Sequence, residues 1–170
     1  MTSWKNTVKV NKGLLSSWTN QMNMKTINES YTGKSLNGVP YREKTILLYG
    51  KRVTGVFPVF EGIKVVLDGS VDALYKQLGN TDYAFYHGTM RLATIKLKEM
   101  LERNAALKKQ FTKEQLDDIQ AGREKVSGKI WHHYEELDGD CPIMQLVDEE
   151  LHGKCNHTGG SYTWNPKHLE

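Results

Sequence analysis

Residues 128–160 read GKIWHHYEELDGDCPIMQLVDEELHGKCNHTGG, and this stretch determines how we interpret the whole chain. Residues 128–133 are predicted to form a strand that ends in a pair of histidines, and residues 143–147 a second strand. Between them, we expect residues 134–142 to form a turn rich in Asp and Glu. The order strand, turn, strand predicts a β-hairpin, and Trp131 is expected to pack beneath it.

A short helix is predicted directly after the hairpin. Asp148 is a suitable N-cap, and the helix is expected to run from Glu149 to about Asn156. Thr158 and the two glycines that follow it would stop the helix. A hairpin that packs on one helix can hold a metal ion between the end of a strand and a face of the helix.

Four of the six histidines lie within 26 residues: His132, His133, His152 and His157. Imidazole is the commonest metal-ligand side chain, and it is the base whose pKa lies nearest neutrality. Because neighbouring residues of a strand point to opposite sides, His132 and His133 do not readily bind the same ion. One of them can be a ligand while the other acts as a general base. Three imidazole ligands with an open fourth position are typical of a catalytic zinc site.

The spacing of the last two histidines leaves alternatives open. Five residues at about 100° each place His152 and His157 about 140° apart on an ideal helix. Either the helix ends or bulges before His157, or Cys155 or Asn156 replaces His157 as a ligand. Two plainer interpretations remain for the whole cluster, namely histidines without a common purpose and a purely structural zinc site.

The rest of the chain predicts an α+β fold. We expect residues 1–30 to be loosely structured and residues 31–170 to form one domain, β-rich over 31–70, helical over 71–122, and completed by the histidine motif over 128–164. Candidate strands lie at residues 45–49, 52–57 and 63–67, with a hairpin turn at Tyr49-Gly50-Lys51. Candidate helices lie at residues 71–78, 82–103 and 113–119, the last opened by a capping box at Thr112–Gln115.

Length and charge narrow the class of protein. The chain has 170 residues, enough for one domain, and no run of apolar residues long enough to cross a membrane. The N-terminus has no apolar core of a standard signal peptide, so we expect none. Both cysteines are expected to be free thiols, although a bridge between them stays open. Residues 1–66 carry ten Lys/Arg and three Asp/Glu, whereas residues 67–170 carry thirteen and seventeen. A basic N-terminal half can bind nucleic acid, or it can be a solvated surface.

Four short motifs carry a resemblance to a known family. They are Ile130-Trp131-His132-His133, Met144-Gln145-Leu146-Val147, Leu151-His152 and His157-Thr158-Gly159-Gly160. Together they resemble the WHH branch of the HNH/endonuclease VII nucleases, which are toxin domains of bacterial polymorphic toxins. The resemblance covers about residues 128–164. It implies a ββα-metal fold and the cleavage of phosphodiester bonds, usually those of DNA.

The resemblance also assigns roles to residues. His132, His152 and His157 look like the ligands of one divalent metal ion, and His133 looks like the general base. Zinc suits three imidazoles, and Mg²⁺ or Mn²⁺ can support turnover. Five cations are expected to hold the nucleic-acid backbone: Lys51, Arg52, Lys64, Arg91 and Lys96.

The resemblance further implies an antibacterial effector that is delivered into the cytoplasm of a target cell, and a cognate immunity protein that protects the producer. Two alternatives stay open: a toxin that cleaves RNA, and a non-catalytic, zinc-stabilised module that binds nucleic acid. The long acidic turn after the histidine pair departs from the family pattern. Its carboxylates could orient a histidine, but a solvated turn is the interpretation that we favour.

Overall fold

The computed structural model describes residues 21–170. The strands are β1 (Met22–Asn23), β2 (Ser35–Leu36), β3 (Val39–Leu48), β4 (Lys51–Pro58), β5 (Lys64–Val66), β6 (Lys129–Asp138) and β7 (Cys141–Asp148). The helices are α2 (Val71–Leu78), α3 (Asp82–Glu102), α4 (Ala105–Lys108), α5 (Lys113–Gln120), α6 (Glu149–Lys154) and α7 (Gly160–Thr163). Two 3₁₀ turns complete this part of the chain, η1 (Glu29–Tyr31) and η2 (Pro166–Leu169). The predicted α+β fold is confirmed.

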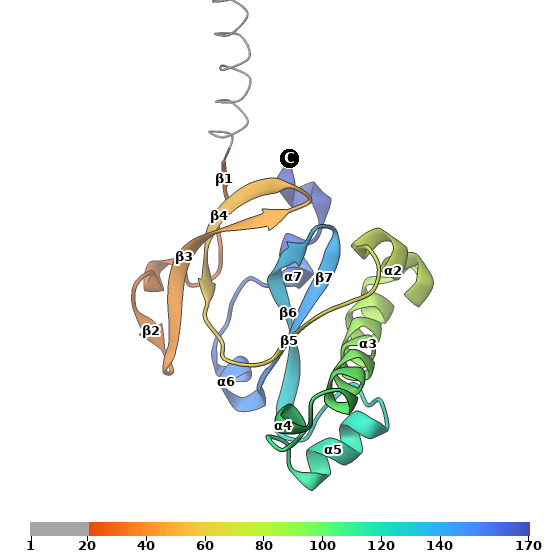
Figure 1. Ribbon diagram of the computed structural model, residues 1–170. Helices are drawn as coiled ribbons and strands as arrows, with labels where there is room; N and C mark the ends of the chain where they lie inside the picture. Colours follow the sequence, from red (N-terminus) through yellow and green to blue (C-terminus); the bar gives the residue numbers. More distant parts are fainter. Residues whose placement is uncertain (1–20) are drawn as a thin grey trace, which may run out of the picture.

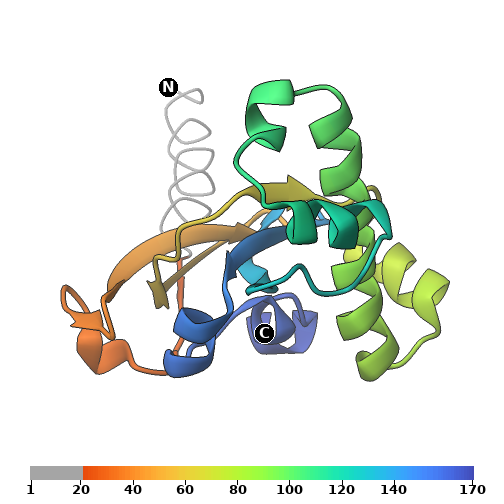
Figure 2. The same cartoon turned by 90° about the horizontal axis from the view of Figure 1, so that it is seen from below.

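The strands form two sheets. One has the order β1-β4-β3-β2 and the other β5-β7-β6, so the histidine hairpin of β6 and β7 gains a third strand from the N-terminal half. The four-stranded sheet and the helices α2–α5 lie on opposite sides of the three-stranded sheet (Figures 1 and 2). In the described part of the chain, no helix combines the length and the apolar character needed to cross a membrane.

Several local predictions are confirmed. Leu48 pairs with Lys51 across a two-residue turn, in which Tyr49 and Gly50 have φ values of 53° and 75°. Such positive values match the right-handed twist of a hairpin. The structure places α2 at the predicted residues and α3 within one residue of its predicted end. The capping box at Thr112 opens α5, with both of its reciprocal hydrogen bonds present.

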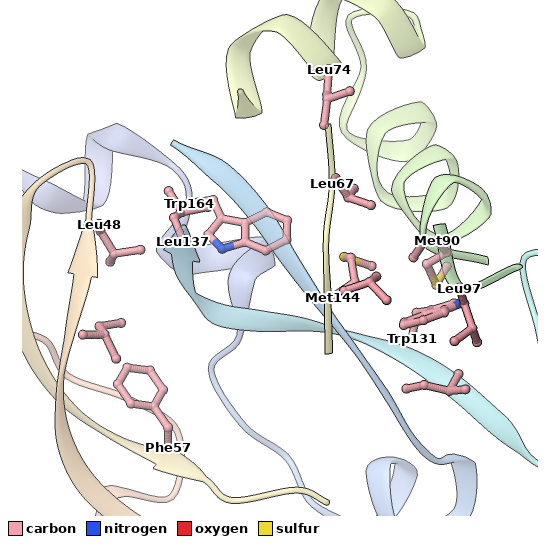
Figure 3. Close-up of a cluster of buried hydrophobic side chains, with 14 of the residues drawn as sticks. Leu48, Phe57, Leu67, Leu74, Met90, Leu97, Trp131, Leu137, Met144 and Trp164 are labelled. Atoms are coloured by element: carbon pink, nitrogen blue, oxygen red, sulfur yellow. The ribbon is translucent and has the colours of Figure 1, made fainter. Parts of the chain in front are cut away.

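The core between the three-stranded sheet and α3 is centred on Trp131. This side chain is fully buried, and its indole Nε1–H donates to Thr94 Oγ1 at 2.9 Å. Met90 and Leu97 of α3 contribute to the same cluster, as Figure 3 shows. Trp131 therefore packs beneath the hairpin as expected, and its hydrogen bond fixes the strand against the helix.

The N-terminal segment differs in part from our expectation of a loose structure over residues 1–30. Residues 1–20 lie outside the described residues. Residues 22–26 are held by the sheet: β1 pairs in parallel with β4, and Met24 and Thr26 are buried. The Thr26 hydroxyl donates to the Val56 carbonyl at 2.7 Å, which ties this segment to the sheet.

The predicted acidic turn at residues 134–142 is wrong. β6 continues to Asp138 and β7 begins at Cys141, so only Gly139 and Asp140 connect the two strands. A register shift between His133 and Leu137 interrupts the side-chain alternation that would have revealed the longer strand. The carboxylates are tolerated in the strand because β3 supplies partners for them: Lys44 pairs with Glu135, and the Leu47 backbone N–H donates to Glu136.

Candidate metal centre

Three histidines from three consecutive segments converge on one point. His132 lies on β6, His152 on α6, and His157 on the loop between α6 and α7. One ring nitrogen from each lies within 4.8 Å of the others, a separation that one metal ion can bridge. The predicted trio is therefore brought together by the fold.

The five-residue spacing is explained by the end of the helix. α6 stops at Lys154, and Cys155 has φ −120° and ψ 88°, so the chain turns before it reaches His157. Cys155 is buried elsewhere, with its thiol 3.3 Å from the Leu36 carbonyl, and both cysteines are free. The sequence left open whether the helix ends before His157 or another residue replaces His157 as a ligand. In the structure the helix ends before His157.

The orientations of two rings identify the nitrogens that face the centre. His157 Nδ1 lies 2.6 Å from the Cys155 carbonyl, so this nitrogen carries the proton and donates it. His157 Nε2 then faces His132 Nδ1 at 3.2 Å, while His132 Nε2 lies 3.5 Å from Glu135 Oε2. If His132 also carries its proton on the outer nitrogen, Nε2, two lone pairs face each other across this gap. A cation relieves their repulsion, so the donor set fits a divalent metal ion.

Burial also prepares the rings to act as ligands. It lowers the pKa of His152 to about 4, with the neighbouring His132 and His157 rings adding to the shift. The pKa of His157 is lowered by the same two causes, burial first and then His132. Both rings are thus neutral near pH 7, the form in which imidazole binds a metal.

His133 points away from its neighbour, as a strand requires. Its ring stacks on that of Tyr86 on α3, with centroids 4.4 Å apart, and its Nε2 lies 2.9 Å from the Thr89 hydroxyl oxygen. Burial lowers the pKa of His133 to about 3, and the nearby His132 contributes to the shift. The four histidines nevertheless line one pocket of about 450 Å³.

The loop that carries His157 is held from the N-terminal side. The Ile27 backbone N–H donates to Thr158 Oγ1 at 3.0 Å. The Asn28 amide and the Tyr41 hydroxyl both donate to the Asn156 carbonyl, at 2.6 and 2.8 Å. Residues far from the histidine motif in sequence therefore set the position of a candidate ligand.

The first glycine of His157-Thr158-Gly159-Gly160 is needed for close packing. A Cβ atom on Gly159 would lie 2.9 Å from the His133 carbonyl oxygen and 3.2 Å from His132 Cε1. No side chain fits there without displacing the histidine pair, which accounts for a glycine at this point of the motif.

The five cations predicted to bind nucleic acid are not gathered around the histidines. Lys51 and Arg52 begin β4, and Lys64 Nζ lies over the Tyr134 ring, 4.1 Å from its centroid. Arg91 approaches Glu124, and Lys96 binds both oxygens of Asp68 at 2.9 and 3.0 Å. None of the five lines the histidine pocket, whose lining includes another cation, the exposed Lys25.

Sequence reasoning missed three residues around the histidines, namely Lys25, Lys44 and Thr89. Glu135 was considered only as one of several turn carboxylates that could orient a histidine, and a solvated position was favoured for it. Lys25 lies in a segment that we expected to be loose. Thr89 lies in a helix that we expected to build the core and, through Arg91 and Lys96, to contact nucleic acid. Leu137, an apolar residue two positions after Glu135, is the one sign in the sequence that the strand continues beyond His133.

One comparison with known proteins gives a match. Residues 49–159, about two thirds of the chain, match the family model described as the DNase/tRNase domain of colicin-like bacteriocin. The matched range includes β4 to α6 and all four histidines of the pocket. No curated protein and no solved structure matches the chain.

Proposed function

Because the chain belongs to the family of DNase/tRNase domains of colicin-like bacteriocins, we propose that this nuclease toxin domain is a metal-dependent endonuclease of the WHH type within the HNH group. The convergence of His132, His152 and His157 beside His133 carries the proposal. The order β6, β7, α6 corresponds to a ββα-metal motif, with ligands from the first strand, the helix and the loop that follows.

His132, His152 and His157 would hold one divalent ion. Three imidazoles suit zinc, whereas Mg²⁺ or Mn²⁺ can support turnover. When bound, the ion polarises the scissile phosphate and stabilises the leaving 3′ oxygen. Three imidazole ligands would leave a coordination position of such an ion for the substrate phosphate.

His133 would remove a proton from the attacking water. A general base must be unprotonated before it acts, and burial keeps the His133 imidazole neutral at pH 7. Thr89 and Tyr86 hold the ring from α3, which limits its freedom before substrate binds.

We propose DNA as the substrate, with RNA as the second candidate. The family description names both activities. A ribonuclease can use the ribose 2′-hydroxyl as its nucleophile and can do without a metal, so a three-histidine metal cluster favours DNA. The opposing candidate of another class is a zinc-stabilised module that binds nucleic acid without cleaving it, for which His133 would be dispensable.

An immunity protein is the expected partner, and the target-cell cytoplasm is the expected place of action. An acidic inhibitor would dock mainly on the basic N-terminal strands and the basic helix face, because complementary charge accelerates association. Neutralising Lys51, Arg52 and Lys64 together should then slow its association and weaken DNA binding. We expected an acidic surface after the histidine pair. Because Glu135 is buried, the exposed carboxylates of that stretch are those near the hairpin tip, Asp138 and Asp140.

The test incubates the purified chain with plasmid DNA and with total RNA, each in EDTA, Mg²⁺, Mn²⁺ or Zn²⁺. His133→Ala should stay folded, bind metal and lose cleavage, whereas His132→Ala should lose metal as well. His87→Ala is the matched control, since His87 pairs with Glu124 and does not line the histidine pocket. If His133→Ala preparations cleaved at the wild-type rate, the cleavage would come from a contaminating nuclease. That result would support the non-catalytic module.

A further inference from the structure

A buried carboxylate lies directly behind the candidate ligand His132. Glu135 is fully buried, and its Oε2 lies 3.5 Å from His132 Nε2. Its other oxygen pairs with Lys44 on β3. Within the described residues, His132 Nε2 and both Glu135 oxygens have no partner at full hydrogen-bond geometry. The polar groups next to this carboxylate are the Lys44 ammonium group and the His132 imidazole.

Charge neutralisation alone does not account for this arrangement. Lys44 already balances Glu135, and its Nζ is itself fixed by the Tyr134 hydroxyl at 3.0 Å and by the Tyr134 ring, 4.7 Å from the centroid. The second carboxylate oxygen is free to serve another donor, and it faces the outer nitrogen of His132. Ligand histidines commonly donate that outer N–H to a carboxylate, which fixes the tautomer and the plane of the ring.

We propose that Glu135 is a positioning residue that accepts the Nε2–H of His132 and so directs His132 Nδ1 at the metal, with Lys44 holding the carboxylate in place. The inference rests on the metal site of the proposed function. Lys44 lies on β3, before the residues matched by the family model. The row of side chains Lys44, Glu135 and His132 therefore connects the N-terminal sheet to the histidine motif.

The proposed contact between Glu135 and His132 predicts a property of the metal-free protein that can be measured without a cleavage assay. With Glu135 present, His132 carries its proton on Nε2. Without it, the Nδ1 atom, 3.2 Å from His157 Nε2, becomes the better place for the proton, because it can be donated to that facing nitrogen. Such a hydrogen bond would block two of the three ligand atoms.

The experiment uses the full chain in three variants. Glu135→Gln keeps an acceptor oxygen and removes the charge, and the double variant Lys44→Met/Glu135→Leu removes both partners without leaving an unpaired charge. Glu136→Gln is the matched control, one residue along the strand, where the carboxylate accepts from the Leu47 backbone instead. Long-range ¹H–¹⁵N spectra of the metal-free proteins report the His132 tautomer, and chelator competition reports zinc affinity.

We expect the double variant to move the His132 proton to Nδ1 and to lower zinc affinity by about 10- to 100-fold, with Glu135→Gln intermediate and Glu136→Gln unchanged. A folded double variant with the wild-type tautomer and zinc affinity overturns the proposal. If the wild-type protein cleaves no nucleic acid, the proposed function fails, but the tautomer comparison still decides the role of Glu135.

Discussion

Thr89 Oγ1 on α3 lies 2.9 Å from His133 Nε2 on β6. The same hydroxyl lies 2.8 Å from the Phe85 carbonyl and 2.9 Å from the Tyr86 carbonyl, so it donates its single proton to the helix backbone. It must therefore accept a hydrogen bond from His133 Nε2–H. The basic nitrogen of His133 is then Nδ1, and α3 determines both the tautomer and the plane of the ring.

Replacing Thr89 with valine keeps the shape of the side chain and removes the acceptor. We expect Thr89→Val to lower the cleavage rate about 10-fold, since a lost hydrogen bond to a buried group costs about 1–3 kcal/mol, while zinc affinity stays unchanged. Thr94→Val is the control, because Thr94 binds Trp131 and not a histidine. Single-turnover cleavage measures the effect. Wild-type rates for Thr89→Val would contradict the assigned tautomer.

A methyl group on Gly159 tests how closely the loop packs on the histidine pair. The added Cβ would lie 2.9 Å from the His133 carbonyl oxygen, so we expect Gly159→Ala to cost about 1–3 kcal/mol of stability and to weaken zinc binding. Gly153→Ala is the matched control on α6, where nothing lies within 4 Å of the new methyl group. It should be neutral or stabilising, because alanine favours a helix over glycine.

Thermal unfolding with and without zinc checks both glycine variants. Equal midpoints for Gly159→Ala and the wild-type protein would mean that the loop can move away from His132 without cost.

The sequence was sufficient for features set by local rules. The turn at Tyr49-Gly50, the cap at Asp148 and the helix that it begins depend on neighbouring residues only, and all three are present. The convergence of the three histidines was also predictable, because strand, turn, strand and helix follow one another directly.

Features that depend on the N-terminal sheet were not predictable. Glu135 lies within an acidic stretch that has the composition of a solvated turn, and its burial depends on Lys44, from a strand 91 positions upstream. The same holds for Asn28, whose amide reaches the loop of His157. Local patterns carry no information about such long-range partners.

Acid should destabilise the metal-free protein through its buried histidines. The folded protein lowers the pKa of His133 to about 3 and of His152 to about 4, whereas the unfolded chain titrates near 6.5. Below about pH 6.5 the unfolded state therefore binds protons that the folded state does not. The stability is fully present above that pH and is lost as the pH falls toward 4.

Denaturant unfolding in EDTA between about pH 7 and 4.5 measures this loss. Each proton taken up on unfolding contributes a slope of about 1.4 kcal/mol per pH unit. His133→Gln should flatten the slope by about one proton. A slope that His133→Gln leaves unchanged would mean that this ring is accessible to protons in the folded state.

Lys25 is the cation whose removal should weaken nucleic-acid binding at the histidine pocket. It is exposed on the rim of that pocket, whereas Lys96 is engaged by both oxygens of Asp68. A cation that contacts a phosphate releases a counterion on binding, so Lys25→Gln should reduce the slope of log affinity against log salt by about one. Lys96→Gln, which removes the same charge from α3, should change the slope less, because Asp68 already competes for that ammonium group.

Titrations of a catalytically inactive His133→Ala background with duplex DNA at several salt concentrations measure both slopes. A larger effect of Lys96→Gln would place the backbone path along α3, where the sequence-based assignment of Arg91 and Lys96 had it, and away from the N-terminal strand.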